Sequence, residues 1–279
     1  MRPVVLITGC TTGSIGHALA LEFSEKGYHV IATSRSLSTM QDLVARDDID
    51  TLELDVTKAD SVAAARTAVA KIVPTGRLNI LVNNAGGPDM AMPAVETDIE
   101  AARALYDVNV FGAVRMIKAF APLLLAAAPD AHIVNVGSVS SLMPVPYLSM
   151  YSSAKAALAA YTDTLRLELA PFGVKVTLAQ TGPTENSTAL PDFSPQVAED
   201  SMYRAHLPVF NAAFRKANEG RMPARTYARA FVAGVPRAGS WMWLGQGVFM
   251  IWFVSTFVPR VVLGFVVTKV FGFDKLRRE

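Results

Sequence analysis

Short apolar runs rich in β-branched residues alternate with longer amphipathic stretches through the first two-thirds of the chain. Strands that alternate with helices are typical of βαβ units, so the pattern predicts an α/β fold with a doubly wound, Rossmann-type parallel sheet. The expected strands are Val4–Ile7, His29–Thr33, Thr51–Leu54, Ile80–Val82, His132–Val136 and Lys175–Ala179. The expected helices are Ile15–Lys26, Ser61–Ile72, Ala101–Tyr106, Val110–Ala127 and Ser152–Leu169.

Residues 184–223 interrupt this alternation. Prolines at 191, 195 and 208 and the polar run Glu185-Asn186-Ser187-Thr188 predict a loop with short helices. A long excursion of this kind is typical of an active-site lid, and an ordinary surface loop is the alternative. Neither a flexible linker nor an internal repeat divides the rest, so we expect a single catalytic domain over residues 1–247 that carries this lid.

The C-terminal part of the chain is strongly apolar and accounts for much of the mean hydropathy of +0.30. Its two longest apolar stretches near the end, Val248–Val258 and Val261–Thr268, are each too short to span about 30 Å of hydrocarbon. Three interpretations of the tail, residues 248–279, stay open: a shallow membrane-embedded or interfacial element, a lid or oligomer interface, or a spanning helix.

Composition narrows the class of protein further. A chain of 279 residues that is 51% hydrophobic and 18% charged can bury the core of one large α/β domain. Its formal net charge of +2 is mild and gives no reason to expect nucleic acid as a partner. The single cysteine, Cys10, excludes an internal disulfide and favours a reducing compartment. No metal site is expected, because the histidines are scattered without ligand spacing, at His17, His29, His132 and His206.

The first expected strand ends in a glycine-rich turn, Thr8–Gly16, with the spacing GxxxGxxG. Glycine lets the backbone turn sharply and approach a diphosphate, whose charge is met by the N-terminus of the following helix. The spacing differs from the GxGxxG of the usual dinucleotide fingerprint. The residues expected to hold a nucleotide cofactor here are Gly9, Thr11, Gly13, Ser14, Ile15 and Gly16.

The next three strand ends extend the predicted cofactor site. The second strand is followed by Arg35, where enzymes that prefer NAD usually carry an Asp or Glu for the ribose 2′-hydroxyl. A guanidinium suits a 2′-phosphate, so Arg35 favours NADP(H) over NAD(H); a solvated arginine is the alternative. Asp55 and Val56 follow the third strand and are placed to meet the adenine. The fourth strand leads into further residues expected beside the nucleotide, Asn83, Ala85 and Gly86.

A tyrosine and a lysine, Tyr151 and Lys155, are four residues apart at the start of a strong helical pattern. That spacing places the phenol and the ammonium on one helix face. A lysine beside a tyrosine lowers the phenol pKa from about 10 toward working pH, which makes a usable proton donor. Ser138 follows the fifth expected strand, where its hydroxyl can hold a substrate carbonyl, and Asn109 opens the preceding long helix.

These motifs, in this order, resemble the short-chain dehydrogenase/reductase family. The matching marks lie within residues 3–190 and are Thr8–Gly16, Asp55, the NNAG of Asn83–Gly86, Asn109, Ser138 and the YxxxK of Tyr151–Lys155. The resemblance implies that Tyr151 protonates a carbonyl oxygen while NADPH delivers hydride to the carbon. It also implies that Lys155 lowers the Tyr151 pKa and binds the nicotinamide ribose. Ser138 would polarise the carbonyl, and Asn109 would hold a water of the proton relay. In the family's layout, Ser240–Gly245 takes the place of the last strand of the sheet.

Two features depart from the usual family pattern. The glycine turn carries one extra residue, Ser14, and is similar in this to that of fungal NADPH-dependent 1-acyldihydroxyacetone-phosphate reductases. Thr181 stands where the family usually has the proline of a Pro-Gly pair, whereas Gly182 is kept and Thr184 is still expected to meet the nicotinamide carboxamide. The apolar tail is also similar to that of these reductases, which favours a membrane surface and a lipid-like substrate.

The sequence therefore predicts an NADP-dependent oxidoreductase that reduces a ketone to a secondary alcohol on a lipophilic substrate such as a 1-acylglycerone 3-phosphate. A fungal biosynthetic ketoreductase acting on a polyketide or terpenoid is the alternative, and a non-redox protein that kept the fold is another. Basic residues of the lid that could meet a substrate phosphate are Arg204, Arg215, Lys216, Arg221 and Arg225. A solvated basic loop is the other interpretation of this set.

The expected location is intracellular. The apolar run Val4–Ile7 is too short for the core of a signal peptide. The basic end of the chain, Lys275–Glu279, favours contact with anionic lipid, so we expect association with the endoplasmic reticulum or lipid droplets, with the cytoplasm as the alternative. Homo-oligomerisation stays open.

Overall fold

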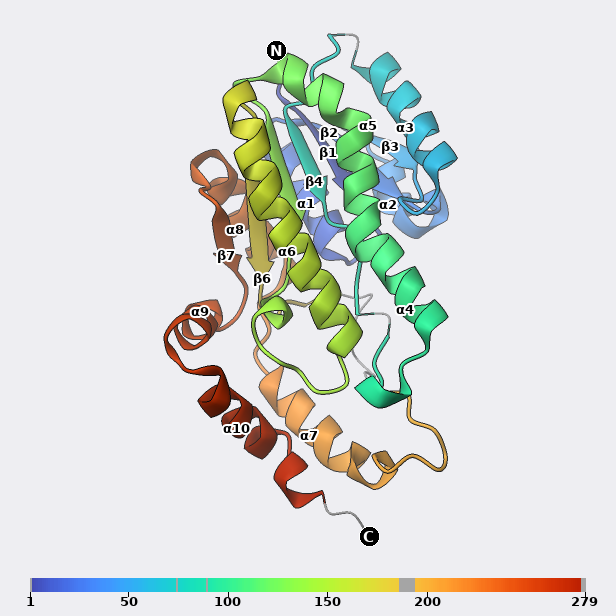
Figure 1. Ribbon diagram of the computed structural model, residues 1–279. Coiled ribbons are helices and arrows are strands. Elements are labelled where there is room, and N and C mark those ends of the chain that lie inside the picture. The colour runs from blue at the N-terminus through green and yellow to red at the C-terminus, as the bar shows by residue number, and fades with distance from the viewer. Residues whose placement is uncertain (1, 74, 89, 186–193, 277–279) are drawn as a thin grey trace.

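Seven parallel strands form the sheet, in the order β3-β2-β1-β4-β5-β6-β7. From β1 the chain moves outward through β2 and β3, then returns and builds β4 to β7 on the other side, so the order reverses between β1 and β4 (Figure 1). This is the doubly wound topology that the sequence predicts. The strands are β1 (Val4–Thr8), β2 (His29–Ser34), β3 (Ile49–Glu53), β4 (Ile80–Asn83), β5 (His132–Val136), β6 (Lys175–Thr181) and β7 (Trp241–Leu244).

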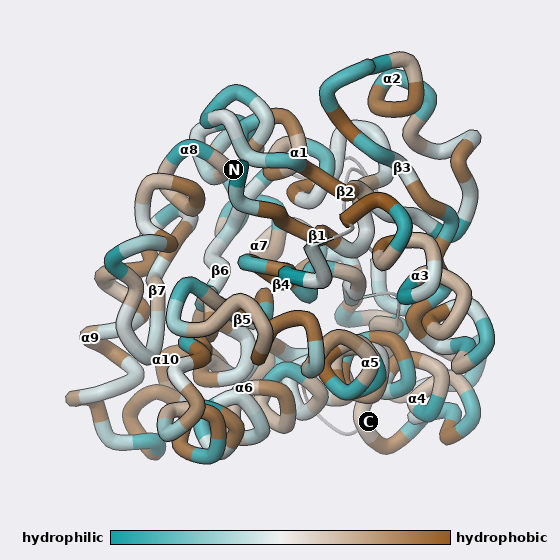
Figure 2. Tube along the Cα trace, turned by 90° about the horizontal axis from the view of Figure 1, so that it is seen from above, coloured by the Kyte–Doolittle hydropathy of each residue, from teal (hydrophilic) through white to brown (hydrophobic). Residues whose placement is uncertain are grey.

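Helices cover both faces of the sheet in this computed structural model, which describes residues 2–73, 75–88, 90–185 and 194–276. One face packs against α1 (Ile15–Glu25), the short α2 (Gln41–Val44) and α8 (Ala224–Gly234). The other packs against α3 (Ala59–Ile72), α5 (Gly112–Ala127) and α6 (Ser149–Leu169), and Figure 2 shows these layers on either side of the strands.

The central strands are apolar on both sides, as a sheet between two helical layers requires. In β1, Val5 and Ile7 join the core under α1 and α8, whereas Val4 and Leu6 join the core under α5. All five residues of β1 are buried. The six strands expected from the pattern are confirmed, with ends that shift by one or two residues, and β7 forms where the seventh was expected.

A π-helical turn, Asp107–Phe111, joins α4 (Ile99–Tyr106) to α5 and makes one continuous helix. Within the described parts of the chain, this helix is the one that is long and apolar enough to cross a membrane by length and composition. Its side chains Met116, Phe120 and Leu124 are buried against the sheet. It is therefore a core helix of the fold, and its π turn contains the buried Asn109.

The predicted lid segment, called the lid below, and the tail lie together beyond the carboxyl ends of the strands (Figure 1). The lid contains α7 (Leu207–Ala217), and the tail forms α9 (Val248–Phe257) and α10 (Arg260–Val270). The two tail helices follow the two apolar stretches expected from the sequence. Several residues used to predict the lid and the basic chain end lie outside the described residues: Asn186, Ser187, Thr188, Pro191, Arg277, Arg278 and Glu279.

An aromatic cluster fastens the tail to the lid. Tyr147 has a φ of 64°, and its ring packs edge-on against Phe210 of α7, with ring centroids 4.7 Å apart. Its hydroxyl lies 3.0 Å from Nδ1 of the buried His206. Phe271, at the end of α10, stacks on Phe210 at 5.4 Å, and Phe273 packs against His206 at 4.3 Å. The tail is thereby held against the segment that leads into α6.

Candidate active site

A pocket of about 710 Å³ opens at the carboxyl ends of the strands. In doubly wound sheets this edge receives the ligand, because the strand order reverses there and leaves a crevice. Four predicted site residues, Gly13, Gly16, Asn83 and Asn109, are not part of its lining. The predicted residues that line it are Gly9, Thr11, Ser14, Ile15, Arg35, Asp55, Val56, Ala85, Gly86, Ser138, Tyr151, Lys155 and Thr184.

The glycine turn brings two strand ends into close contact. A Cβ atom at Gly16 would lie 2.4 Å from the Gly9 carbonyl oxygen and 2.5 Å from Nδ2 of Asn84. That amide donates to the carbonyl oxygens of Thr8, at 2.8 Å, and Gly9, at 3.1 Å. Asn84 was not among the predicted site residues, although it is the second asparagine of the NNAG motif.

Ser14, the extra residue of the turn, caps α1. Its side chain accepts a hydrogen bond from the His17 backbone N–H at 3.1 Å, as a good N-cap residue does. Gly9 and Gly13 have φ values of 75° and 78°, in the left-handed region that favours glycine. Ser14 and Ile15 line the pocket, so the N-terminus of α1, the end of a helix that attracts anions, lies at the pocket wall.

A hydroxyl-rich corner surrounds the end of β2. Oγ of Ser34 lies 3.3 Å from Oγ1 of Thr11 and 2.6 Å from Oγ1 of Thr39. Arg35 is exposed at the rim of the same corner. A guanidinium and several hydroxyls are the donors that bind a phosphate monoester. Sequence reasoning identified Arg35 and Thr11 but missed Ser34, which lines the pocket and faces Thr11 only through the parallel pairing of β1 with β2.

Asp55 is the acidic member of the pocket lining. Burial opposes its ionisation, but hydrogen bonds from Thr57 and the charges of Lys58 and Arg35 outweigh burial and hold its pKa below the usual value. Its Oδ1 accepts from the Thr57 backbone N–H at 2.9 Å and from the Thr57 hydroxyl at 2.7 Å. The carboxylate is thus fixed in its ionised form and can accept a hydrogen bond from an adenine amino group.

A buried row of amides ties the sheet to the helix that carries Tyr151. Asn83 Nδ2 donates to Asn135 Oδ1 at 2.8 Å, and Asn135 Nδ2 donates to Thr162 Oγ1 at 2.9 Å. The row runs from β4 through β5 to α6. Asn83 therefore supports the site from behind by tying the end of β4 to β5.

Tyr151 and Lys155 occupy successive turns of α6. The Lys155 Nζ atom lies 5.8 Å from the centroid of the Tyr151 ring and donates to the Val136 carbonyl oxygen at 3.0 Å. Ser138 follows β5 and lines the same pocket, and its Oγ accepts from the Ser140 backbone N–H at 3.2 Å. The structure therefore brings together the three side chains that the sequence expected to act on a carbonyl.

Asn109 lies behind these residues in the π-helical turn. Its Nδ2 donates to the carbonyl oxygens of Leu105, at 3.0 Å, and Gly87, at 3.2 Å, while its Oδ1 is buried without a partner among the described residues. A Cβ atom at Gly86 would lie 2.5 Å from this Oδ1 and 3.6 Å from Lys155 Nζ. An unpartnered buried acceptor facing a lysine can hold an ordered water.

The loop after β6 closes the pocket without the family's usual proline. Oγ1 of Thr181 lies 2.8 Å from the hydroxyl of Tyr227 in α8, which anchors the strand end. A Cβ atom at Gly182 would lie 2.5 Å from Cγ1 of Val248, the first residue of α9, and 3.0 Å from the Gln246 carbonyl oxygen. The kept glycine of this motif therefore allows the chain at the start of the tail to approach closely.

The tail supplies an apolar wall of the pocket. Ile251 and Val254 of α9 line it, as do Leu263 and Val267 of α10 and Phe271 just beyond. Phe214 of α7 lines it from the lid. One face of each tail helix is therefore part of the pocket, which leaves the other face for a membrane or a partner. The interpretations of the tail as a lid and as a membrane element are thus compatible.

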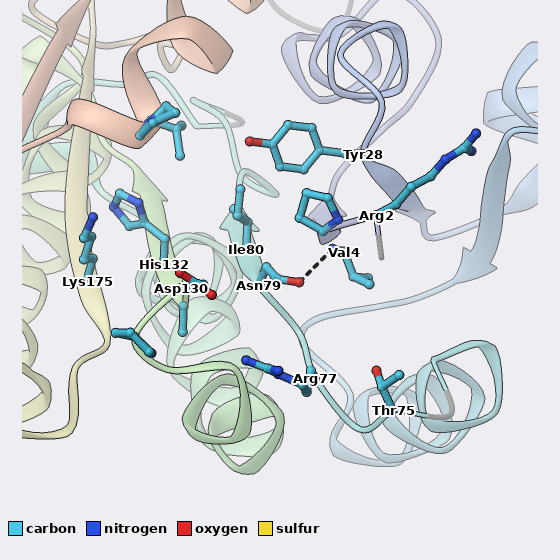
Figure 3. Close-up of a pocket in the computed structure, with 15 residues that line it drawn as sticks. Arg2, Val4, Tyr28, Thr75, Arg77, Asn79, Ile80, Asp130, His132 and Lys175 are labelled. Carbon is cyan, nitrogen blue, oxygen red and sulfur yellow. Dashed lines mark hydrogen bonds between the residues drawn. The ribbon is translucent and has the colours of Figure 1, made fainter.

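A second cavity of about 430 Å³ lies at the opposite edge of the sheet, where Arg77, Lys175 and Asp130 line it with exposed side chains (Figure 3). Asn79 Oδ1 accepts from the Val4 backbone N–H at 2.9 Å. Burial lowers the pKa of His132 to about 4, which keeps this imidazole neutral and suited to its 2.9 Å contact with Thr177. Asn79 and His132 thus stabilise the amino-terminal ends of the strands. The candidate active site is the pocket at the carboxyl ends.

The burial of Lys155 predicts a pH dependence of stability. Burial lowers its pKa from 10.5 to about 8, so between these values the unfolded chain holds a proton that the folded chain has lost. The free energy of unfolding of the cofactor-free protein is therefore expected to rise across this window, by at most about 3 kcal/mol. Urea titrations from pH 7 to 10 should show this rise in the wild type and not in Lys155→Met. The exposed Lys175→Met is the control, and parallel wild-type and Lys155→Met curves would contradict the prediction.

Comparison with known proteins agrees with this site. Residues 3–196 match the family model of short chain dehydrogenases. An NADPH-dependent 1-acyldihydroxyacetone phosphate reductase of Schizosaccharomyces pombe is 48% identical over 178 residues, covering 64% of this chain and 58% of the reductase. The short-chain dehydrogenase ptmH of Penicillium ochrochloron is 38% identical over 97% of this chain and 98% of its own.

A solved structure shares the fold over nearly its whole length. It is a short chain dehydrogenase from Burkholderia cenocepacia in complex with NADP, with a TM-score of 0.75, 25% identity and coverage of 95% of this chain and 97% of that one. Sheet order, motifs and comparisons define a short-chain dehydrogenase/reductase. The chain belongs to this family of oxidoreductases.

Proposed function

We propose that the protein is an NADPH-dependent reductase that converts the ketone of a lipophilic substrate to a secondary alcohol. One observation carries the proposal: Ser138, Tyr151 and Lys155 share a pocket with the apolar wall of the tail helices. The choice of cofactor is supported by the similarity to an NADPH-dependent reductase and to a dehydrogenase whose structure was solved in complex with NADP. We propose for this function a chain organised as a catalytic domain over residues 1–247, which includes a lid at 184–223, followed by a tail at 248–279.

The cofactor fits the polar part of the pocket. The turn at Gly9, Gly13 and Gly16 would hold the diphosphate. Its glycines have no side chains to keep a ligand away from the backbone, and the N-terminus of α1 attracts an anion. Arg35 would hold the 2′-phosphate together with the hydroxyls of Thr11 and Ser34. Residues proposed to contact adenine, nicotinamide and their riboses are Asp55, Val56, Ala85, Gly86, Tyr151, Lys155 and Thr184.

The reaction needs a hydride and a proton. The hydride for the carbonyl carbon would come from NADPH when it is bound. The Tyr151 hydroxyl donates the proton to the carbonyl oxygen, and the nearby Lys155 ammonium stabilises the phenolate that is left. Ser138 donates a hydrogen bond to the same oxygen and so favours the negative charge that develops there. A water on Asn109 Oδ1 passes a proton toward Lys155, which restores the tyrosine.

The proposed function is tested by measuring NADPH consumption with a panel of ketones: acylglycerone phosphates, steroids and aromatic ketones. Both a 1-acylglycerone 3-phosphate and the ring systems of a biosynthetic ketoreductase fit an apolar wall. The panel therefore contains both classes, and the relative turnover rates distinguish them. Turnover with at least one lipophilic ketone, faster with NADPH than with NADH, is the expected result. Tight NADPH binding without turnover of any ketone would instead indicate a non-redox protein.

We further propose that the tail rests on a lipid surface. Phe249, Phe253 and Phe257 recur every fourth residue along α9, and with their neighbours they form an exposed tail face on the side away from the pocket. The members of this face, with the fraction exposed, are Phe249 (76%), Met250 (65%), Phe253 (48%), Phe257 (62%), Val261 (84%), Val262 (48%) and Phe265 (64%). Large apolar side chains gathered in this way mark membrane or protein contacts.

Replacing Phe253, Phe257 and Phe265 together by serine is expected to weaken binding to anionic phospholipid vesicles by at least about 100-fold. The reason is that each large apolar side chain transferred from water contributes roughly 1.5 kcal/mol or more. Vesicle flotation measures the change, and the Kd for NADPH should stay constant. Phe172→Ser is the matched control, because Phe172 is 62% exposed and lies outside the tail.

The competing explanation of the exposed tail face is a subunit interface. If the wild type stays in the soluble fraction during flotation, and the triple variant turns a dimer or tetramer into a monomer in light scattering, the membrane proposal is wrong. The exposed tail face would then be buried between copies of the chain.

A further inference from the structure

The structure distinguishes one lid cation from the others. Of the five basic lid residues expected near a substrate phosphate, Arg221 lines the pocket, and Arg204, Arg215, Lys216 and Arg225 are absent from its lining. Arg225 instead pairs with Glu25 of α1 at 3.0 Å. Arg221 is half-buried.

The backbone around Arg221 is held against the end of β6. Gly220, just before the arginine, ends a turn and has a φ of 67°, in the left-handed region that favours glycine. The next residue, Met222, forms a β-bridge with Thr184. Its backbone N–H donates to the Pro183 carbonyl oxygen at 3.2 Å, and its own carbonyl oxygen accepts from the Glu185 N–H at 2.8 Å. Arg221 is thus fixed beside Pro183 and Thr184, which line the pocket.

The charges around the pocket are unbalanced. Its described lining contains three cations, Arg35, Lys155 and Arg221, and a single carboxylate, Asp55. Arg35 lies at the end of β2 and contributes to the low pKa of Asp55, while Lys155 faces Tyr151. Within the described residues, no carboxylate oxygen lies within 4 Å of the Arg221 guanidinium. Among the described residues, the lid side of the pocket therefore carries a positive charge that no carboxylate of the lining pairs with.

Apolar side chains adjoin this charge. Phe214 and Ala217, which precede Arg221 in the lid, line the pocket, and the walls from α9 and α10 continue the apolar surface. The neighbouring Asn218 amide is already engaged, since its Nδ2 donates to the Phe214 carbonyl oxygen at 2.8 Å. A guanidinium beside an apolar wall fits a ligand with an anionic oxygen group and an apolar body. An arginine fork matches the oxygen atoms of carboxylates and phosphates, and a phosphate monoester carries the larger negative charge of the two.

We infer that Arg221 binds a phosphate group within the pocket. The inference deepens the proposed function and rests on it for the chemistry of the substrate. Two ligands can bring that phosphate: an apolar ketone with a phosphate head, or the diphosphate of the cofactor. Both require the same contact with the guanidinium. In the first case kcat/KM for the phosphorylated ketone depends on Arg221, and in the second the Kd for NADPH does.

The test compares Arg221→Gln with Arg215→Gln, a lid variant that removes a cation absent from the pocket lining. Each protein is assayed with a 1-acylglycerone 3-phosphate and with the same ketone without its phosphate. Losing a charge-assisted hydrogen bond worth about 1.5–3 kcal/mol lowers an equilibrium or rate constant by roughly 10–150-fold. If the phosphate belongs to the substrate, kcat/KM for the phosphorylated ketone falls by this factor in Arg221→Gln, and the neutral ketone changes less than threefold.

Calorimetric titrations with NADPH and with glycerol 3-phosphate supply a readout that does not depend on activity. If the phosphate belongs to the cofactor, the Kd for NADPH rises more than tenfold in Arg221→Gln and both ketones lose activity equally. If neither Kd nor either kcat/KM changes by more than threefold relative to Arg215→Gln, the inference is overturned. Should the wild type reduce no ketone at all, the proposed function fails, and the two titrations still decide whether Arg221 binds phosphate.

Discussion

Replacing Tyr151 by phenylalanine is expected to lower kcat for ketone reduction by about 10²–10⁴-fold, the usual contribution of a general acid. The Kd for NADPH should stay within about twofold. The substitution removes the transferable proton and keeps the ring, which packs both against the aromatic cluster of lid and tail and against the cluster around Leu105 and Ala154. Stopped-flow hydride transfer and fluorescence titration with NADPH measure the two quantities.

The matched control for this variant is Tyr161→Phe. Tyr161 lies on the same helix but packs into the core on the α3–α5 side of the sheet and is not part of the pocket lining. Its loss of a hydroxyl should leave kcat unchanged. If Tyr151→Phe keeps kcat within threefold of the wild type, Tyr151 is not the proton donor and the assignment of the pair with Lys155 is wrong.

The sheet and the polar half of the pocket could be predicted because their signals are local. Strand and helix periods mark β1 to β6, and each motif follows its strand directly in the chain. Parallel strands place their carboxyl ends at one edge, so the order of the motifs along the chain already implies that they meet. Tyr151 and Lys155 needed only the helix period to share a face.

Contacts between distant segments could not be read in this way. Ser34 and Asn84 belong to the site through strand pairing and through the close approach at Gly16, neither of which leaves a periodic trace. Nothing in the pattern around Asn109 indicates a π-helical turn. Such a turn adds one residue to a turn of α-helix, and the side chains along it are of the same kinds as in the α-helix on either side. Its orphaned Oδ1 is visible only with the fold assembled.

The tail shows a limit of a different kind. Its apolar residues cover nearly the whole circumference of α9 and α10, so hydrophobic periodicity cannot separate a face that lines a pocket from one that faces outward. The aromatic contacts of Tyr147, Phe210 and Phe271 decide the orientation, and these residues are far apart in the chain. In the same way, five lid cations were equivalent in the sequence, and the bridge between Thr184 and Met222 singles out Arg221.

Cofactor choice gives the second large expected effect. Arg35→Asp is expected to lower the ratio of kcat/KM for NADPH to that for NADH by about 10²–10³-fold. The change removes a charge-assisted hydrogen bond to the 2′-phosphate, worth about 1.5–3 kcal/mol, and sets a carboxylate against the same dianion. The new carboxylate can accept from a ribose 2′-hydroxyl, as the acidic residue of NAD-specific enzymes does. Initial rates with both cofactors at a fixed saturating ketone measure the ratio.

Two companion variants isolate the cause of this shift. Arg35→Gln removes the cation without adding an anion, so it should lower the ratio by roughly 10–100-fold, less than the aspartate does. Arg66→Asp reverses a charge on the exposed side of α3, outside the pocket lining, and should leave the ratio unchanged. If Arg35→Asp leaves the ratio within threefold of the wild type, the guanidinium does not face the 2′-phosphate. Ser34, Thr11 and Thr39 would then have to bind that group through their hydroxyls alone.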